Sequence, residues 1–232
     1  MKKVRPVKVA IIDNSINPSL YDPVLHWSSY LKVTWEAFRA PEGRFPDLQK
    51  DYTHLILTGS EASILERETW VEEEVRVIRE AADKGLSLLG SCYGHQLLAL
   101  ALAGPSHVRR CAQPEIGWIE VEIREESHLL GSKGRAYSFS VHFDEVTNLS
   151  DPFVALASSA HCPIQAFGVK GKNIWGLQIH PEIDILTGRK LLRTFFPFHS
   201  RHSVLFEYAL DSPPKDSGLI HHIVDNFVSF FP

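Results

Sequence analysis

The segment from residue 90 to residue 96 constrains the fold of this 232-residue chain more than any other part of it. Its sequence is Gly-Ser-Cys-Tyr-Gly-His-Gln, with a short apolar run before it and a longer apolar stretch after it, at residues 97–102. This order predicts a strand, a sharp turn and a helix, with the cysteine held on the turn. The N-terminus of such a helix favours a thiolate, so Cys92 is the candidate nucleophile.

A nucleophilic cysteine needs a general base, and the base needs a group that orients its ring. The sequence His180-Pro181-Glu182 offers both at the end of an apolar run, residues 174–179. That run is typical of a buried strand, so its end should lie at the rim of a sheet. We therefore predict that His180 is the base and that Glu182 orients it, with the triad assembled in space.

These motifs resemble class I (triad-type) glutamine amidotransferase domains, which carry GxCxGxQ and, far downstream, HPE. Other segments resemble stand-alone members related to the amidotransferase half of GMP synthetase, and the resemblance covers roughly residues 7–190. These segments are residues 56–60, 115–118, 142–146 and 162–167. The resemblance implies hydrolysis of the glutamine side-chain amide through a thioester on Cys92, with ammonia released for a partner synthetase. It implies no metal and no organic cofactor.

The resemblance also implies which residues hold the substrate. The backbone amides of Ser60 and Tyr93 would form the oxyanion hole. The substrate-binding residues would be Gly59, Gln96, His142 and Phe143. Two positions depart from the family: Ser60 stands where a second glycine is usual, and Phe143 stands where glycine is often found. The first departure changes the backbone freedom at the oxyanion hole, and the second leaves the substrate specificity open.

Several polar residues have two interpretations. Asp144 and Glu145 either bind the ammonium group of the substrate or pair with a nearby arginine or lysine. Two pairs of tail histidines have spacings seen in metal sites, namely His199 with His202 and His221 with His222. No cysteine or carboxylate cluster accompanies them, so we expect solvated side chains there and no metal.

The composition excludes several classes of partner. The net charge is −4 and no long run of one sign occurs, so neither a nucleic-acid surface nor a membrane surface is expected. No segment approaches the ~18 apolar residues of a membrane span, and the first residues lack the pattern of a signal peptide. Three cysteines without regular spacing argue against a disulfide framework. A cytoplasmic enzyme with reduced thiols is the expectation.

The first hundred residues alternate strand and helix, which predicts a parallel sheet with helices on both faces. From residue 116 to residue 179 the pattern changes to short strands, which predicts an antiparallel patch that continues the sheet. The predicted fold is an α/β, flavodoxin-like three-layer sandwich with a mostly parallel central sheet and a helical C-terminal extension. The predicted division is an amidotransferase domain at residues 1–190 and the extension at residues 191–232.

A helix is predicted within residues 218–231 of the extension. Leu219, Ile223, Phe227 and Phe230 lie at helix spacings and form one apolar stripe. Such a stripe must be buried, either on the core of its own domain or on a neighbouring copy in a homodimer.

The sequence leaves three functions open. The chain is an amidotransferase subunit that passes ammonia to a separate synthetase, a stand-alone hydrolase of γ-glutamyl amides or peptides, or a non-catalytic binding module. The complete triad argues against the third. An exposed apolar patch on the sheet rim or tail would favour a partner, and a roomy pocket beyond the leaving group would favour peptide hydrolysis.

Overall fold

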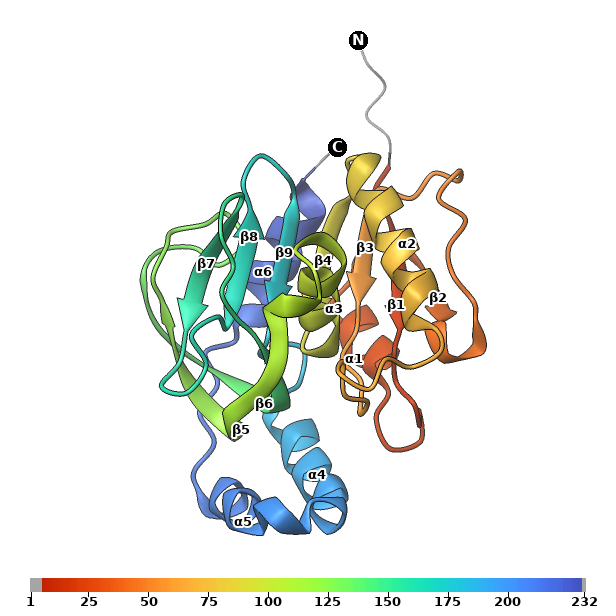
Figure 1. Cartoon of the computed structure of the whole chain (residues 1–232). Helices are drawn as coiled ribbons and strands as arrows, with labels where there is room; N and C mark the ends of the chain where they lie inside the picture. Colours follow the sequence, from red (N-terminus) through yellow and green to blue (C-terminus); the bar gives the residue numbers. More distant parts are fainter. Residues whose placement is uncertain (1–5, 231–232) are drawn as a thin grey trace.

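The computed structural model describes residues 6–230. One nine-stranded sheet runs through the molecule in the order β2-β1-β3-β4-β9-β8-β7-β5-β6 (Figure 1). The strands are β1 (Lys8–Asp13), β2 (Thr34–Arg39), β3 (His54–Leu57), β4 (Ser87–Ser91), β5 (Val108–Ile123), β6 (Gly134–Val146), β7 (Phe153–Ser158), β8 (Ala166–Val169) and β9 (Ile174–Leu177). The helices are α1 (Pro23–Ser28), α2 (Val71–Asp83), α3 (Tyr93–Leu102), α4 (Ile185–Phe195), α5 (Ser203–Asp211) and α6 (Leu219–Ser229).

The sheet has a parallel half and an antiparallel half. Strands β2, β1, β3, β4 and β9 pair in parallel, and the pairs from β9 to β6 are antiparallel. Successive side chains of β1 point to opposite faces of the sheet and so belong to two cores. Ala10 and Ile12 pack with α2 and α3, whereas Val9 and Ile11 pack with α1 and α6. The predicted three-layer α/β arrangement is confirmed, with the antiparallel patch continuing the sheet.

Local boundaries differ from the predictions where tertiary pairing extends an element. The antiparallel pair β5 and β6 is far longer than the short strands expected, at 16 and 13 residues. Its register shifts between Arg110 and Glu115, which interrupts the alternating pattern that would have revealed its length. Helix α1 starts at Pro23, because Asp22 caps it and proline is favoured in the first turn of a helix.

Helix α6 covers its own domain. Ile223 and Phe227 are fully buried in the core formed with β1, β3 and α1, and Leu219 and Phe230 pack partly against it. The Phe227 carbonyl also bonds the buried His54 ring at 2.9 Å. The apolar stripe of α6 is therefore buried within this chain.

Helices α4 and α5 lie together beyond the end of the sheet, below β5 and β6 in Figure 1. Their apolar residues, including Leu191 and Phe206, share a small core with Phe139 of β6. The division predicted after residue 190 falls inside α4, and the two-part organisation stays a prediction. Within residues 6–230, none of the helices has the length and apolar character needed to cross a membrane.

Candidate active site

Cys92 occupies a sharp turn between β4 and α3. Its φ is 48° and its ψ is −103°, a conformation that is unfavourable for a residue with a side chain. Two hydrogen bonds hold the turn: the Cys92 amide donates to the Leu177 carbonyl at 2.7 Å, and the Gln96 amide donates to the Cys92 carbonyl at 3.1 Å. The strand-turn-helix predicted from the sequence is therefore present, and it places Cys92 at the carboxyl ends of the parallel strands.

Two glycines allow the elements around this turn to approach closely. A Cβ atom on Gly94 would lie 2.7 Å from the Leu57 carbonyl carbon, and one on Gly90 would lie 2.8 Å from the His95 nitrogen. These neighbours are backbone atoms, which cannot move aside as a flexible side chain can. Glycine at both positions therefore lets α3 sit directly against β3 and β4.

His180 and Glu182 follow β9, the strand that pairs with β4, so they reach the same edge of the sheet as Cys92. The His180 amide donates to the Phe139 carbonyl at 2.8 Å, which fixes the backbone of the base. His180 Nδ1 lies 2.8 Å from Glu182 Oε1, and Ser91 Oγ donates to the same oxygen at 3.2 Å. Both His180 and Glu182 are buried. The carboxylate is thus held in place from two sides.

The charges around His180 favour its protonated form. Burial lowers the pKa of His180. The adjacent Cys92 sulfur and Glu182 carboxylate raise it by a larger amount, so the pKa lies well above its ordinary value. Glu182 occupies Nδ1, so Nε2 is the ring nitrogen left for proton transfer. The Cys92 Sγ donates a hydrogen bond to the Val141 carbonyl at 3.8 Å. The protonated ring is the form that can give a proton to a leaving group.

The two predicted oxyanion-hole residues flank the thiol. Ser60 follows β3 and Tyr93 begins α3, and both line the pocket that contains Cys92 and His180. A Cβ atom on Gly59 would lie 2.8 Å from His180 Cε1, so this turn lies directly against the base and requires glycine there. The role of the Ser60 and Tyr93 amides stays a prediction.

The residues predicted to bind the substrate differ in how much freedom they have. Gln96 lines the pocket, but its Nε2 donates to the Asp144 carbonyl at 2.9 Å and to Gln178 Oε1 at 3.1 Å. His142 is buried, with Nε2 3.1 Å from Glu115 Oε2 and Nδ1 3.1 Å from the Asp144 carbonyl. In this structure both side chains hold the end of β6 in place.

Phe143 has a different environment, against the histidines that follow α4. Its ring stacks on His199, with centroids 4.7 Å apart, and lies 5.0 Å from His202. The expectation that these two histidines are solvated is wrong, because residues 195–202 fold back over the pocket. His221 and His222 are exposed as expected.

Asp144 and Glu145 are paired with arginines. Arg110 lies 3.0 Å from Asp144, and Arg109 lies 2.8 Å from Glu145. Asp144 also accepts a hydrogen bond from Ser63 Oγ at 2.6 Å. Of the two interpretations, the arginine pairing is the one present, and Asp144 still lines the pocket.

Glu115, His142 and Cys162 place one potential metal-ligand atom each within 4.8 Å of one another. Glu115 is already bonded to His142, to Ser159 Oγ at 2.7 Å and to Gln165. Burial raises the pKa of the Cys162 thiol, which keeps it neutral. These features indicate a buried hydrogen-bond network that supports β5 and β6.

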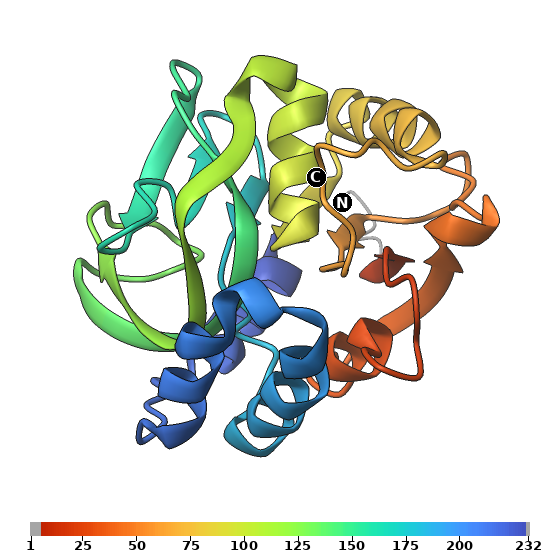
Figure 2. The same cartoon turned by 60° about the horizontal axis from the view of Figure 1, so that its bottom comes forward.

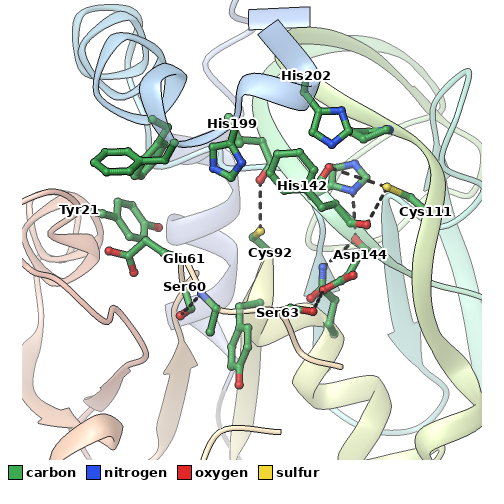
Figure 3. Close-up of a pocket in the computed structure, with 18 of the residues that line it drawn as sticks. Tyr21, Ser60, Glu61, Ser63, Cys92, Cys111, His142, Asp144, His199 and His202 are labelled. Carbon is green, nitrogen blue, oxygen red and sulfur yellow. Dashed lines mark hydrogen bonds between the residues drawn. The ribbon is translucent and has the colours of Figure 1, made fainter. Parts of the chain in front are cut away.

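The pocket around Cys92 measures about 760 Å³. Sequence reasoning missed much of its lining, namely Tyr21, Glu61, Ser63, Arg110 and residues 195, 198–201. Figure 3 shows Tyr21 and Glu61 on one side of Cys92, with Cys111, His142 and Asp144 on the other. Figure 2 shows the segments that bear the missed residues, the loop before α1 and the turn between α4 and α5, which lie far apart in the sequence. No local periodicity marks the loop positions among them, whereas Arg110 lies in β5 and Phe195 in α4.

We expect iodoacetamide to label Cys92 at least about tenfold faster than either other cysteine at pH 7.5. Burial, with the nearby Glu145 and Asp144 carboxylates, raises the pKa of Cys111 to about 12, and burial raises that of Cys162 as well. Peptide mass mapping measures the labelling, and urea-unfolded protein, in which all three thiols should react, is the control. Faster labelling of Cys111 or Cys162 in the folded protein would contradict this assignment.

The fold and the site together define an α/β protein with a Cys-His-Glu constellation at the edge of the sheet. Comparison with protein families gives the particular class: the model of the family described as glutamine amidotransferase class-I matches residues 10–197. The chain belongs to this family, as the sequence motifs indicated.

Several proteins similar to this chain are GMP synthases. The chain is 34% identical over 152 residues to the glutamine-hydrolyzing GMP synthase of Clostridium novyi. The aligned region covers 63% of this chain and 28% of that protein. It is 36% identical over 125 residues to a chain of Methanoculleus marisnigri that is named as one subunit of a glutamine-hydrolyzing GMP synthase, covering 53% and 67% respectively. The chain thus spans less than a third of the length of the first relative and about two thirds of the second.

Solved structures share the fold. A glutamine amidotransferase from Thermotoga maritima superposes with a TM-score of 0.76 at 20% identity, covering 97% of this chain and 99% of that chain. One from Methylobacillus flagellatus gives 0.76 at 18% identity, covering 99% and 96%. These matches confirm the predicted flavodoxin-like class and extend over the α4–α6 region.

Proposed function

We propose that this class I glutamine amidotransferase hydrolyses the side-chain amide of glutamine through a γ-glutamyl thioester on Cys92. One observation carries the proposal: Cys92 and His180 line the same pocket, and His180 Nδ1 lies 2.8 Å from the buried Glu182 carboxylate. Nucleophile, base and orienting group are then in the order that acyl transfer requires.

In the first step the Cys92 thiolate attacks the carboxamide carbon, and the Ser60 and Tyr93 amides hold the developing oxyanion. The His180 imidazolium gives its proton to the nitrogen as the carbon–nitrogen bond breaks, which releases ammonia. In the second step His180 takes a proton from water, the hydroxide attacks the thioester, and glutamate leaves. Glu182 keeps the ring oriented through both steps.

Two observations favour an acceptor on a separate synthetase chain. Some relatives are named as single subunits of a glutamine-hydrolyzing GMP synthase. In addition, residues 186–211 carry four exposed large apolar side chains, namely Leu186, Phe198, Val204 and Tyr208. Exposed apolar surface is typical of a docking face. Ammonia made at Cys92 would then pass to the partner.

The pocket supports a second candidate, a stand-alone hydrolase of γ-glutamyl amides. Its volume of about 760 Å³ falls in the range that holds drug-sized ligands, whereas glutamine has only ten non-hydrogen atoms. A larger amine on the γ-carbonyl would use the remaining space.

The test is the release of glutamate by the purified chain alone, with glutamine and with a panel of γ-glutamyl amides. We expect glutamate from glutamine, because the triad is complete within one chain. Faster release from a γ-glutamyl amide would favour the second candidate, and stimulation by an added synthetase chain would favour the first. No release from any substrate, alone or with the synthetase, would overturn the proposed function.

A further inference from the structure

Tyr21 is a buried residue of the pocket whose polar atom has no assigned role. It lies in the loop between β1 and α1, only 5% of it is exposed, and it lines the pocket. Its hydroxyl is buried and has no hydrogen-bond partner among residues 6–230. Buried hydroxyls are nearly always paired, so this one is available to a ligand in the pocket.

The hydroxyl lies beside the base. A Cβ atom built on Gly59 would be 2.7 Å from the Tyr21 oxygen and 2.8 Å from His180 Cε1, so both atoms lie within 3 Å of one point. The Tyr21 and His180 rings meet edge to face, with centroids 6.2 Å apart. Burial raises the pKa of Tyr21 well above its ordinary value, and the charges of Glu182, Cys92 and Glu61 raise it further. Tyr21 therefore remains a neutral hydroxyl.

The chemistry of the site assigns this side of the pocket to the leaving group. His180 must give its proton to the departing nitrogen, so that nitrogen has to lie within hydrogen-bond reach of the imidazole. Tyr21 stands on this side, opposite Asp144 and Cys111 (Figure 3). Apolar side chains form part of the wall around Tyr21, because Phe139, Ile183 and Leu191 form one cluster with it and also line the pocket, while Glu61 lies on the same side. Bulk water has little access to such a wall, which strengthens any hydrogen bond made there.

We propose that Tyr21 forms a subsite for the departing amine, either ammonia or a small primary amine with an apolar substituent. This inference rests on the proposed function. Before acyl transfer, the Tyr21 oxygen accepts an N–H of the scissile amide and holds the nitrogen toward His180. The carbon–nitrogen bond then breaks as the carbon–sulfur bond to Cys92 forms, and the His180 proton moves to the nitrogen. Tyr21 itself neither gains nor loses a proton.

The test compares an amide with an ester, because an ester leaving group has no N–H for Tyr21 to accept. We expect Tyr21→Phe to lower kcat/KM for glutamine about tenfold relative to kcat/KM for the γ-methyl ester of glutamate. The ring is kept, so the melting temperature should not change. Tyr30→Phe is the matched control, since Tyr30 lies against His221, outside the pocket, and its variant should keep the wild-type ratio.

The outcomes separate this inference from the proposed function. If Tyr21→Phe slows the amide and the ester equally, the hydroxyl has only a structural effect and the inference is overturned. The same conclusion follows if neither rate changes. If the wild-type protein releases glutamate from no substrate, alone or with the synthetase, the proposed function fails and the subsite fails with it.

Discussion

Replacing Cys92 by serine is expected to lower the turnover of glutamine by at least about 10⁴-fold, because removing one member of a catalytic triad has an effect of this size. A serine hydroxyl is a weaker nucleophile than a cysteine thiol and needs stronger activation by the base. His180→Ala should be about as severe, because it removes the proposed base of the triad. Glutamate release in a coupled assay gives the measurement.

Glu182→Gln should be milder than either change, by about tenfold or more, since it alters only the tautomer and orientation of the ring. Cys111→Ser is the control, because Cys111 bonds the Phe143 carbonyl at 2.9 Å and has no contact with the base. Wild-type turnover in the His180 variant would overturn the triad. Equal losses of turnover in the Cys92 and Cys111 variants would contradict the assignment of Cys92 as the nucleophile.

Gly94→Ala is expected to destabilise the protein by about 3 kcal/mol, the upper part of the range for overpacking. The new methyl group would overlap the Leu57 carbonyl and would lie 2.8 Å from Leu57 Cβ, so α3 must move away from β3. Alanine favours a helix over glycine by about 1 kcal/mol, and the overlap has to exceed this gain. Urea unfolding followed by circular dichroism measures the change.

Gly171→Ala serves as the control for Gly94. Gly171 has a φ of 71°, but nothing lies within 4 Å of the position of a new Cβ. Only backbone strain of about 1–2 kcal/mol should follow. If Gly94→Ala is as stable as the wild type, the close approach of α3 to β3 does not require glycine, and the account of this turn is wrong. Because α3 starts at Cys92, we also expect the Gly94 variant to lose activity.

The sequence was sufficient wherever a residue's role depends on its neighbours in the chain. The structure of residues 90–96 follows from the local sequence, since glycines, an apolar strand and an apolar helix define a turn that places Cys92 at the pocket. The same holds for His180 and Glu182, because a buried strand must end at the rim of the sheet. The stripe of α6 likewise showed that a helix there needed a core to cover.

The sequence could not place residues whose role depends on distant contacts. Tyr21 and the residues around His199 lie in loops, where no hydrophobic period indicates the direction of a side chain. They meet at Cys92 only because β1, β4 and α4 bring the ends of separate segments to one edge of the sheet. The length of β5 could not be predicted for a related reason, because its pairing with β6 continues across a shift in register.

The same distinction applies to His142 and Phe143. Both are recognisable in a motif, and both were assigned to the substrate. The fold places His142 against the buried Glu115 and Phe143 against His199. A polar side chain brought into a core must find a partner there, and only the tertiary structure decides which partner is near. The sequence by itself determined the layered fold and predicted the nucleophile and its base, because those follow from local backbone needs and periodicity, whereas the walls of the pocket follow from long-range packing.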